Sequence, residues 1–433
     1  MTLLILILAL VVGLVVGLPV AAVLLSAGLG LDLALSAFPL HLALGEVLWS
    51  AADSSLLLAI PLFILMGELL LRSGSAARAY EALQTSVGRL PGGLLHANIG
   101  TAALFATVSG SSLATAGTVG RVAMPQGQRL GYDPRLFAGS IAAGGTLGIL
   151  VPPSINLIIY GFLTQTSIPR LFAAAIVPAL LMVMLFMLVS ALLCLRYPQL
   201  GGPQHRRPPA PSQAPEPGSR LQALAPMLLL MLLVGVPLYT GFATPSESAA
   251  LGVTGALMIC SWQRRLDWPA LRAALDGTLR LTGLIVLILL AARFLNFVLA
   301  TSGLGGDLQQ FFDGLDTRPL VILLIIIAAH ILLGLFIETL SMMILSLPVV
   351  APIILGLGLD PVWFGVLFIL LVELALITPP VGLNLFVVHA AREHGQLGEV
   401  AIGAAPYALA MLVIIVLLIA FPSLALFLPE LLH

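Results

Sequence analysis

The sequence predicts an all-α polytopic membrane protein with two inverted-topology repeats, each containing a re-entrant helical hairpin and a broken helix. Three observations support this fold class. The 433-residue chain is 60% hydrophobic and 9% charged, with a mean hydropathy of +1.13, whereas soluble proteins carry about 25% charged residues. Apolar runs of membrane-spanning length recur along it. A long segment is duplicated, and the basic residues around its copies indicate opposite orientations.

The composition also excludes several classes of function. The net charge of −1 gives no reason to expect a nucleic-acid partner. Cys194 and Cys260 lie at the ends of apolar runs, so we expect packing residues rather than a disulfide or a metal site. The sequence contains no phosphate loop, HExxH or GxSxG motif. We therefore expect no enzymatic activity.

The duplicated segment is the most specific pattern. Asp133-Pro134 is followed by Pro152-Pro153, and Asp360-Pro361 is followed at the same 19-residue interval by Pro379-Pro380. The copies lie 227 residues apart. The same shift relates Pro125 to Pro352 and Ser111-Ser112 to Glu338-Thr339. Internal repeats in an apolar chain are typical of transporter folds, whose binding sites lie near the bilayer midplane where broken helices meet.

The apolar pattern predicts the elements in chain order. In the first half they are a tight helical hairpin at 3–17 and 20–31, a span at 56–71, a re-entrant hairpin at 94–124 with the polar tip Ser109-Gly-Ser-Ser112, a broken helix at 136–162 interrupted at Gly144-Gly145 and Pro152-Pro153, and a span at 171–195. A Pro-rich linker at 196–220 separates the halves. In the second half they are spans at 221–239, 246–260 and 281–300, a hairpin at 320–355, a broken helix at 362–388 and a last span at 400–428.

The charge distribution predicts which loops are cytoplasmic. Cytoplasmic loops carry an excess of Lys and Arg, and Arg residues concentrate in the loops at 72–93, 121–135, 196–220, 261–280 and 390–399. The loops at 301–319 and 356–361 are acidic and are expected outside. This path places both termini in the periplasm. It requires the first hairpin to enter from the cytoplasm and the second from outside, because a single kinked span in place of either would put a loop of the wrong charge on one side.

Polar residues gather at the first tip and the first helix break. The tip offers Ser109, Ser111 and Ser112, and the break contains Gly145 and Pro152. Proline has no N–H and opens the helix, and freed carbonyls need partners inside a bilayer. Neutral carbonyl and hydroxyl oxygens suit Na⁺. Gly and Ser also serve helix packing, but their duplication beside a Pro-Pro break favours a cation site.

The second tip and break offer a comparable set of oxygens. Its candidate ligands are Thr339, Thr378, Asn384 and the carbonyls opened by Pro379-Pro380. Glu338 and Glu373 also fall in predicted membrane segments, where ionisable residues are candidates for function. For Glu338, at a tip, function and simple solvation are equally plausible, whereas Glu373 is expected to pair inside the bundle.

Three further polar features have two interpretations each. Asn156, just after the first break, either contacts substrate or braces the site. Arg293 either binds a substrate carboxylate bidentately or pairs with an acid such as Glu338 or Glu373, and pairing is slightly favoured. The motif Thr244-Pro-Ser-Glu247 opens a helix, and capping alone explains it.

Several longer motifs are specific when they are taken together. They are Ala59-Ile-Pro-Leu-Phe-Ile-Leu-Met-Gly67, Ser109-Gly-Ser-Ser112 with Ala114-Thr115-Ala116 and Thr118-Val119-Gly120, Gly144-Gly-Thr-Leu-Gly148 with Pro152-Pro-Ser-Ile155, Thr244-Pro-Ser-Glu247, and Thr378-Pro-Pro-Val-Gly-Leu-Asn-Leu-Phe386. Together they resemble the large membrane subunit of tripartite ATP-independent periplasmic (TRAP) transporters. The resemblance covers essentially the whole chain, and the Pro-rich linker is its least typical part.

The resemblance implies a function and partners. Such subunits act in the bacterial inner membrane with a small four-helix membrane subunit and a soluble periplasmic binding protein. They import organic acids, such as dicarboxylates or sialic acid, and use a Na⁺ gradient. These large subunits are similar to elevator-type transporters, in which a transport domain slides against a fixed scaffold. For this chain the resemblance implies scaffold spans at 1–93 and 221–300 and a moving domain built from the repeat cores at 94–195 and 320–428.

The resemblance also assigns candidate sites for two Na⁺ ions and the substrate. One Na⁺ site is expected between the tip 109–112 and Gly145, Val151 and Pro152. The other is expected between the tip 334–339, which includes Gly334, and the break 378–380. Substrate is expected between the tips, with Ser112, Thr115, Pro153, Asn156, Arg293, Glu338 and Pro380 as candidate contacts.

Two alternatives belong to other classes. A stand-alone inverted-repeat anion transporter would work without a binding protein and would couple uptake to protons through Glu338 or Glu373. An intramembrane enzyme would need a nucleophile–base pair or metal ligands that face each other across spans, and the sequence offers only scattered histidines. A passive channel is disfavoured, because paired tips and broken helices are typical of alternating access.

Overall fold

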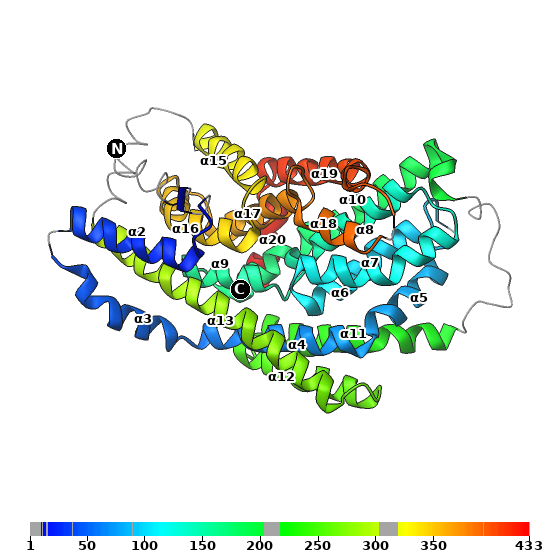
Figure 1. Ribbon diagram of the computed structural model, residues 1–433, viewed down its shortest axis with the longest axis horizontal. Coiled ribbons are helices and arrows are strands. Elements are labelled where there is room, and N and C mark those ends of the chain that lie inside the picture. Colours follow the sequence, from blue (N-terminus) through cyan, green and yellow to red (C-terminus); the bar gives the residue numbers. More distant parts are fainter. Residues whose placement is uncertain are drawn as a thin grey trace.

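The computed structural model describes residues 10, 12–13, 16–36, 38–88, 90–202, 217–302, 319–392 and 394–432. All regular structure in this part of the chain is helical (Figure 1), which confirms the predicted all-α fold. Three predicted features lie largely outside the described residues. They are the first apolar piece at 3–17, the linker at 196–220 and the acidic loop at 301–319.

Seven α-helices of the described chain form a group that we call the frame layer. It runs along the lower side of Figure 1, with α4 packed on α12, and α13 packed on α2, α3 and α4. Its helices are α2 (Val20–Leu35), α3 (Leu44–Ala52), α4 (Ser55–Ser73), α5 (Ser75–Val87), α11 (Pro217–Tyr239), α12 (Pro245–Trp262) and α13 (Trp268–Thr301), and the short 3-10 helix η1 (Leu40–Ala43) precedes α3.

The other α-helices of the described chain form what we call the core layer, in the upper part of Figure 1. In the first half they are α6 (Leu94–Ser109), α7 (Ser112–Arg129), α8 (Pro134–Leu150), α9 (Ile155–Thr164) and α10 (Ile168–Arg196), which the 3-10 helix η2 (Pro198–Gly201) follows. In the second half they are α15 (Pro319–Gly334), α16 (Thr339–Gly356), α17 (Pro361–Leu376), α18 (Leu383–Ala390), α19 (Leu397–Ala420) and α20 (Ser423–Leu432).

Corresponding helices of the two halves make corresponding contacts. The hairpin arms α6 and α7 pack on α8, as α15 and α16 pack on α17. In addition, α7 packs on α18 and α16 packs on α9. Each hairpin therefore contacts the helix that follows the break of the other half, and the two halves interlock.

The repeated Asp-Pro pair starts a helix in each half. The Asp133 Oδ1 atom accepts hydrogen bonds from two first-turn N–H groups at 3.0 and 2.9 Å. The Asp360 Oδ1 atom does the same at 2.7 and 3.2 Å. Pro134 and Pro361 occupy the first helical position, where a missing N–H costs nothing. The motif that reveals the duplication is thus a helix start, and its role is structural.

The chain is a multi-pass membrane protein. Within its described part, six helices are long and apolar enough to cross a bilayer, and α8 with α9 makes a seventh candidate with a bend of 42°. The exposed residues Leu180, Met184, Leu188 and Leu192 recur at four-residue intervals on α10. An apolar stripe at this spacing is one face of a helix, and exposed apolar surface of this kind is typical of a face that meets lipid or another membrane protein.

The helix boundaries differ from the predicted ones in several places. The predicted interruption at Gly144-Gly145 is wrong, because α8 is continuous from Pro134 to Leu150, and α3 lies in a stretch for which no helix was predicted. The predicted loop at 72–93 contains α5, and α13 begins at Trp268, inside the predicted loop at 261–280. The predicted last span at 400–428 is two helices, which separate at 421–422 because Pro422 cannot donate a helical N–H. The capping interpretation of 244–247 agrees with the structure, in which the Glu247 carboxylate accepts from the Thr244 N–H at 2.8 Å.

Candidate functional site

The first hairpin turns tightly at Gly110, with φ of +57°. Glycine adopts this left-handed conformation at little cost. The Ser111 hydroxyl caps α7 by accepting from the Ala114 N–H at 3.4 Å. The hydroxyls of Ser109 and Thr115 lie 2.7 Å apart. The sequence therefore places a cluster of hydroxyl groups at the point where the two arms meet, as predicted for this tip.

This tip rests directly on α8, just before the first break. A Cβ atom added to Gly148 would lie 2.5 Å from the Ser111 carbonyl oxygen, so only glycine permits the contact. The Ser112 hydroxyl donates to the Thr146 carbonyl at 3.4 Å, and Ser112 is buried. The structure thus brings the predicted tip and break of the first half together.

The first break itself is enclosed by protein. Pro152 and Pro153 are buried and joined by a cis peptide bond, and Val151 is half-buried. The Ser154 hydroxyl donates to the Ile149 carbonyl at 2.5 Å, which satisfies one carbonyl freed by the break. The Asn156 Nδ2 atom is buried and has no hydrogen-bond partner in the described chain. A buried donor of this kind is costly unless a ligand satisfies it.

The structure places Asn384 against the middle of α8, beside the first hairpin, although the sequence grouped it with the second break. Its Nδ2 atom donates to the Ala142 carbonyl of α8 at 3.2 Å and lies 3.0 Å from the Cβ position of Gly145. Its Oδ1 atom is buried and has no hydrogen-bond partner among the residues that the structure describes. This amide oxygen, with the carbonyl and hydroxyl oxygens nearby, is an uncharged ligand of the kind that suits Na⁺. It comes from the other half of the chain because α18 packs on α8.

A small cavity lies between the second tip and the second break. Its volume is about 10 Å³, and its lining includes Gly334, Thr339, Ala375 and Gly382. This volume holds one water-sized particle. Gly334 packs against the Cβ atom of Ala375, which brings α15 close to α17. The structure therefore joins the predicted tip at 334–339 to the segment around the break.

Residues 378–380 of the second break do not line this cavity. The Thr378 hydroxyl instead donates to the Leu374 carbonyl at 2.6 Å. Pro379 and Pro380, joined by a cis peptide bond, are exposed. The part of the break that reaches the cavity is the following turn, at 381–383.

The two carboxylates have different surroundings. Glu338 is exposed and caps α16, with its oxygens accepting from the N–H groups of Leu340 and Ser341 at 3.1 and 3.2 Å. Glu373 is fully buried in α17 beside the backbone of Leu150, and no ion pair joins its carboxylate to another residue of the described chain. No ion pair joins Arg293 to either acid in this part of the chain. The Arg293 side chain extends instead from α13 towards Phe162 of α9 in the core layer, away from both tips.

Sequence reasoning gave Gly67 no role, and the structure supplies one. A Cβ atom at this position of α4 would lie 3.2 Å from the carbonyl oxygens of Val108 and Ser109. The frame layer therefore touches the first tip through a glycine. A glycine in the middle of the apolar run 56–71 was the available signal, because such a residue often marks a close helix contact.

The described residues contain no group of three or more His, Cys, Asp or Glu side chains placed to hold a metal ion. Cys194 and Cys260 are both buried with free thiols, as expected for packing residues.

Comparison with known proteins agrees with this arrangement. Residues 7–424 match the family model described as "Tripartite ATP-independent periplasmic transporter, DctM component". The chain is 32% identical over 384 residues to the C4-dicarboxylate TRAP transporter large permease protein of Pseudomonas aeruginosa, covering 88% of each chain. It is 30% identical over 385 residues to the sialic acid TRAP transporter large permease protein of Vibrio cholerae, covering 88% of this chain and 87% of the relative.

A solved structure shares the fold. The YdaH transporter of Alcanivorax borkumensis superimposes with a TM-score of 0.63 at 18% identity, over 93% of this chain and 97% of that protein. At this identity the likeness concerns the fold alone. The family match and the two relatives carry the assignment, and this chain belongs to the tripartite ATP-independent periplasmic transporters as a large permease subunit.

Proposed function

We propose that this chain imports a small organic acid across the bacterial inner membrane, driven by Na⁺, as the large subunit of a tripartite transporter. The relatives that transport C4-dicarboxylates and sialic acid by name support the substrate class. A small four-helix membrane subunit and a soluble periplasmic binding protein complete the complex. The binding protein delivers the acid, and this chain carries it through the membrane.

The observation that carries Na⁺ coupling is the meeting of each hairpin tip with a helix opened near a Pro-Pro pair. At the first tip, the hydroxyls of Ser109 and Ser112 and the Oδ1 atom of Asn384 are buried, uncharged oxygen ligands for a cation. This Oδ1 atom has no hydrogen-bond partner in the described chain. At the second, a cavity of single-ion size adjoins Thr339. Neutral oxygens in a small buried space favour a weakly held monovalent cation over a divalent one.

The division into two layers supports an elevator mechanism. Both tips and both breaks belong to the core layer, whereas α2 to α4 and α11 to α13 pack mainly on one another, and α4, α5 and α11 meet the core layer at α6. Sliding the core layer as a body would move both ion sites and the substrate together. Helices of the frame layer would stay fixed in the membrane and hold the small subunit.

Uptake into proteoliposomes tests this function. The vesicles would contain this chain with its small subunit, and a cognate binding protein preloaded with a panel of organic acids would be added with and without an inward Na⁺ gradient. We expect uptake of one acid to require both the binding protein and Na⁺. Uptake that ignores the binding protein and follows pH would overturn the proposal.

Glu373 favours a second candidate, proton coupling. A carboxyl group buried without a counter-ion is costly when charged, and Glu373 forms no ion pair among the described residues. Under Na⁺ coupling, we expect Glu373→Gln to keep Na⁺-driven uptake within about twofold, because a neutral amide replaces a neutral acid. Under proton coupling, the same variant would lose uptake driven by a pH gradient while still exchanging substrate. Measuring uptake under a Na⁺ gradient and under a pH gradient therefore separates the two mechanisms.

A further inference from the structure

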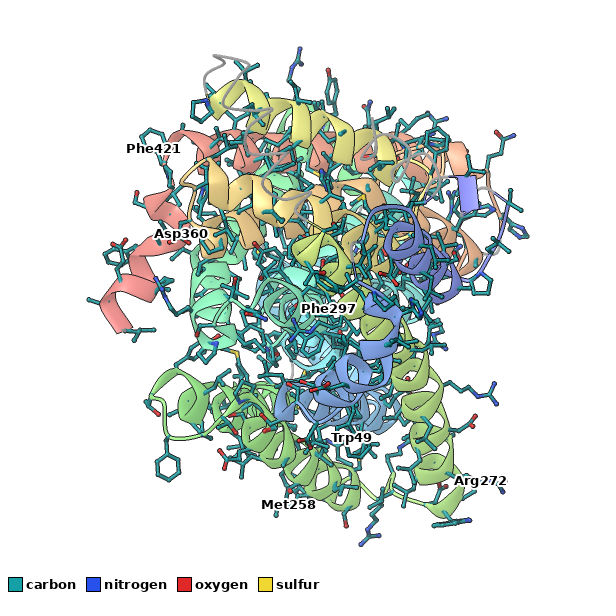
Figure 2. All side chains as sticks on the ribbon, turned by 90° about the vertical axis from the view of Figure 1, so that its left-hand side faces the viewer. Trp49, Met258, Arg272, Phe297, Asp360 and Phe421 are labelled. Carbon is teal, nitrogen blue, oxygen red and sulfur yellow. The ribbon has the colours of Figure 1, made fainter. Side chains whose placement is uncertain are left out.

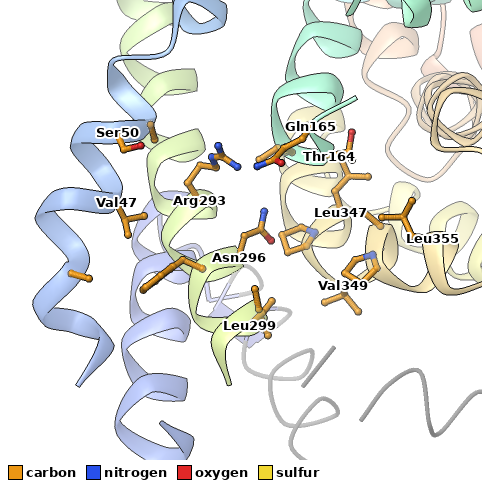
Figure 3. A pocket seen from close by; sticks show the side chains of 18 of the residues that line it. Val47, Ser50, Thr164, Gln165, Arg293, Asn296, Leu299, Leu347, Val349 and Leu355 are labelled. Atoms are coloured by element: carbon orange, nitrogen blue, oxygen red, sulfur yellow. The ribbon is translucent and has the colours of Figure 1, made fainter. Parts of the chain in front are cut away.

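A cavity of about 780 Å³ lies on the seam between the two layers. It is bounded by α3 and α13 of the frame layer and by α9 and α16 of the core layer (Figure 3). None of its lining residues belongs to a hairpin tip or a helix break. A volume of this size accommodates a small organic molecule. The cavity is therefore a space of substrate size separate from the site at the tips.

Arg293 is the one cation among the lining residues of this cavity. The Arg293 Cζ atom lies 5.0 Å from the ring centroid of Phe162 in α9, a cation–π distance. No acid among the described residues lies within ion-pair distance of it. Glu46 is the one carboxylate in the lining, and it is exposed. The guanidinium is thus held by an aromatic face, while its N–H groups form no ion pair.

Amide side chains accompany this guanidinium. Asn296 lies one turn further along α13, and Gln165 follows the end of α9. Figure 3 shows Arg293 and Asn296 directed from α13 into the space opposite Gln165 and Thr164. Arginine binds carboxylates through two parallel N–H donors, and the amides add further donors. This chemistry recognises an organic anion.

The cavity lies toward the end of the molecule that is predicted to face the periplasm. The helices α13 and α16 end at loops predicted to be external, and Arg293 is eight residues before the last residue of α13, or about 12 Å along the axis. Figure 2 looks onto this end, with Phe297, another lining residue, near its centre. Arg293 also borders a second cavity of about 480 Å³, between α9 and the start of α12.

We propose that Arg293, with Asn296 and Gln165, forms an anion-capture site on the periplasmic side of the seam. It receives the carboxylate of the substrate before the substrate reaches the tips. This inference rests on the proposed function for the identity of its ligand. Its position gives it a distinct role: Arg293 belongs to the frame layer, whereas the tip sites belong to the core layer.

Charged thiol reagents test the site without any transport. Ser50 lines the cavity and is exposed, so Ser50→Cys in a chain with Cys194→Ala and Cys260→Ala provides one reporter thiol. Its reaction rates with an anionic sulfonatoethyl and a cationic trimethylammonioethyl methanethiosulfonate would be compared. A nearby guanidinium attracts the first and repels the second. We expect Arg293→Gln to lower the anionic-to-cationic rate ratio at least about fivefold at low salt.

Two variants serve as controls for this measurement. Arg293→Lys keeps the charge and should keep the ratio. Arg280→Gln removes an exposed arginine of the same helix, thirteen residues or about 20 Å away, and should also leave the ratio unchanged. An equal ratio in Arg293→Gln and the unmodified chain, or an equal loss in Arg280→Gln, would overturn the proposal.

Transport then tests the order of events. In proteoliposomes, we expect Arg293→Gln to raise the concentration of loaded binding protein needed for half-maximal uptake about tenfold, as for the loss of one charge-assisted pair. The Na⁺ concentration for half-saturation should not change. A changed Na⁺ requirement would place Arg293 in the ion site and overturn the separate capture role. If the unmodified protein shows no Na⁺-dependent uptake, the proposed function fails, and the thiol result still decides whether the cavity attracts anions.

Discussion

The two hairpin tips arise from one duplicated pattern but have different surroundings. At the first, Ser112 and Thr115 are buried, with 3% and 0% exposure. At the second, Phe336 is 68% exposed and Glu338 is exposed as well. The frame layer accounts for part of the difference, because Gly67 of α4 lies against the carbonyls of the first tip. The comparison suggests that contact with the frame, rather than the repeat itself, decides which tip is closed.

The largest expected effect concerns the contact that closes the first tip. We expect Gly148→Val to reduce uptake at least about tenfold, because its Cβ atom would lie 2.5 Å from the Ser111 carbonyl oxygen and overpacking of this kind costs about 1–3 kcal/mol. Initial uptake rates at matched protein levels check it. The matched control is Gly283→Ala, where no atom lies within 4 Å of the added Cβ. Equal rates for both variants would show that the close contact is not needed.

The next prediction concerns the single-ion cavity at the second tip. Thr339 lines the cavity, whereas the Thr378 hydroxyl donates to Leu374 at 2.6 Å. We expect Thr339→Val to raise the Na⁺ concentration for half-maximal uptake about fivefold, as for the loss of one oxygen ligand worth about 1 kcal/mol. Thr378→Ser keeps its hydroxyl and should leave the Na⁺ requirement unchanged. If Na⁺ titration of uptake gives the reverse order, the cavity is not the ion site.

A smaller effect is expected at the residue that caps α16. Glu338→Ala removes three hydrogen bonds to Leu340 and Ser341 and should destabilise the protein by about 1 kcal/mol. Thermal unfolding in detergent measures this loss. Glu338→Ser replaces one cap with another, as at Ser111, and should recover most of the stability. If Glu338→Ala left the stability unchanged and altered the pH dependence of uptake, Glu338 would have a role in coupling transport to protons.

The smallest expected effect depends on pH, at the contact between the second half and the start of α8. The Glu399 carboxylate accepts from the Arg392 guanidinium at 2.7 Å. This hydrogen bond, with the N–H of Gln396 and the charges of Arg392 and Arg135, holds the pKa of Glu399 below its ordinary value of 4.5 despite some burial. A lowered pKa stabilises the folded state above pH 4.5, and this contribution is lost as the pH falls through the folded-state pKa.

Melting temperatures at a series of pH values check this prediction. We expect the contribution of Glu399 to be constant between pH 7 and about 5 and to decline below about 4.5. Glu399→Gln should be less stable than the unmodified chain at pH 7, and the difference should shrink as the pH is lowered. Because Glu399 is partly exposed, the effect is expected to be modest. A difference that is independent of pH would exclude the ion pair as its cause.

Much of the fold could be predicted because it depends on neighbouring residues. The shared shift of 227 residues predicted two equivalent cores, and α7 and α16 have the corresponding bounds. Proline pairs predicted where α8 and α17 end. The break of the last span at Pro422 was missed, because a single proline is common inside transmembrane helices that continue and α16 itself continues through Pro348 and Pro352.

The sequence by itself determined the helical class, the duplication, the helix starts at Asp133 and Asp360, and the breaks near the two proline pairs. Each of these follows from local backbone chemistry or from the cost of apolar surface in water. Only the tertiary structure decided that Asn384 contacts α8 of the first half, that Gly67 touches the first tip, and that Arg293 faces a seam cavity. These contacts join segments that are far apart in the chain. Because the two halves share the same local pattern, that pattern does not determine which half supplies the partner of a given side chain. The packing of the helices determines it.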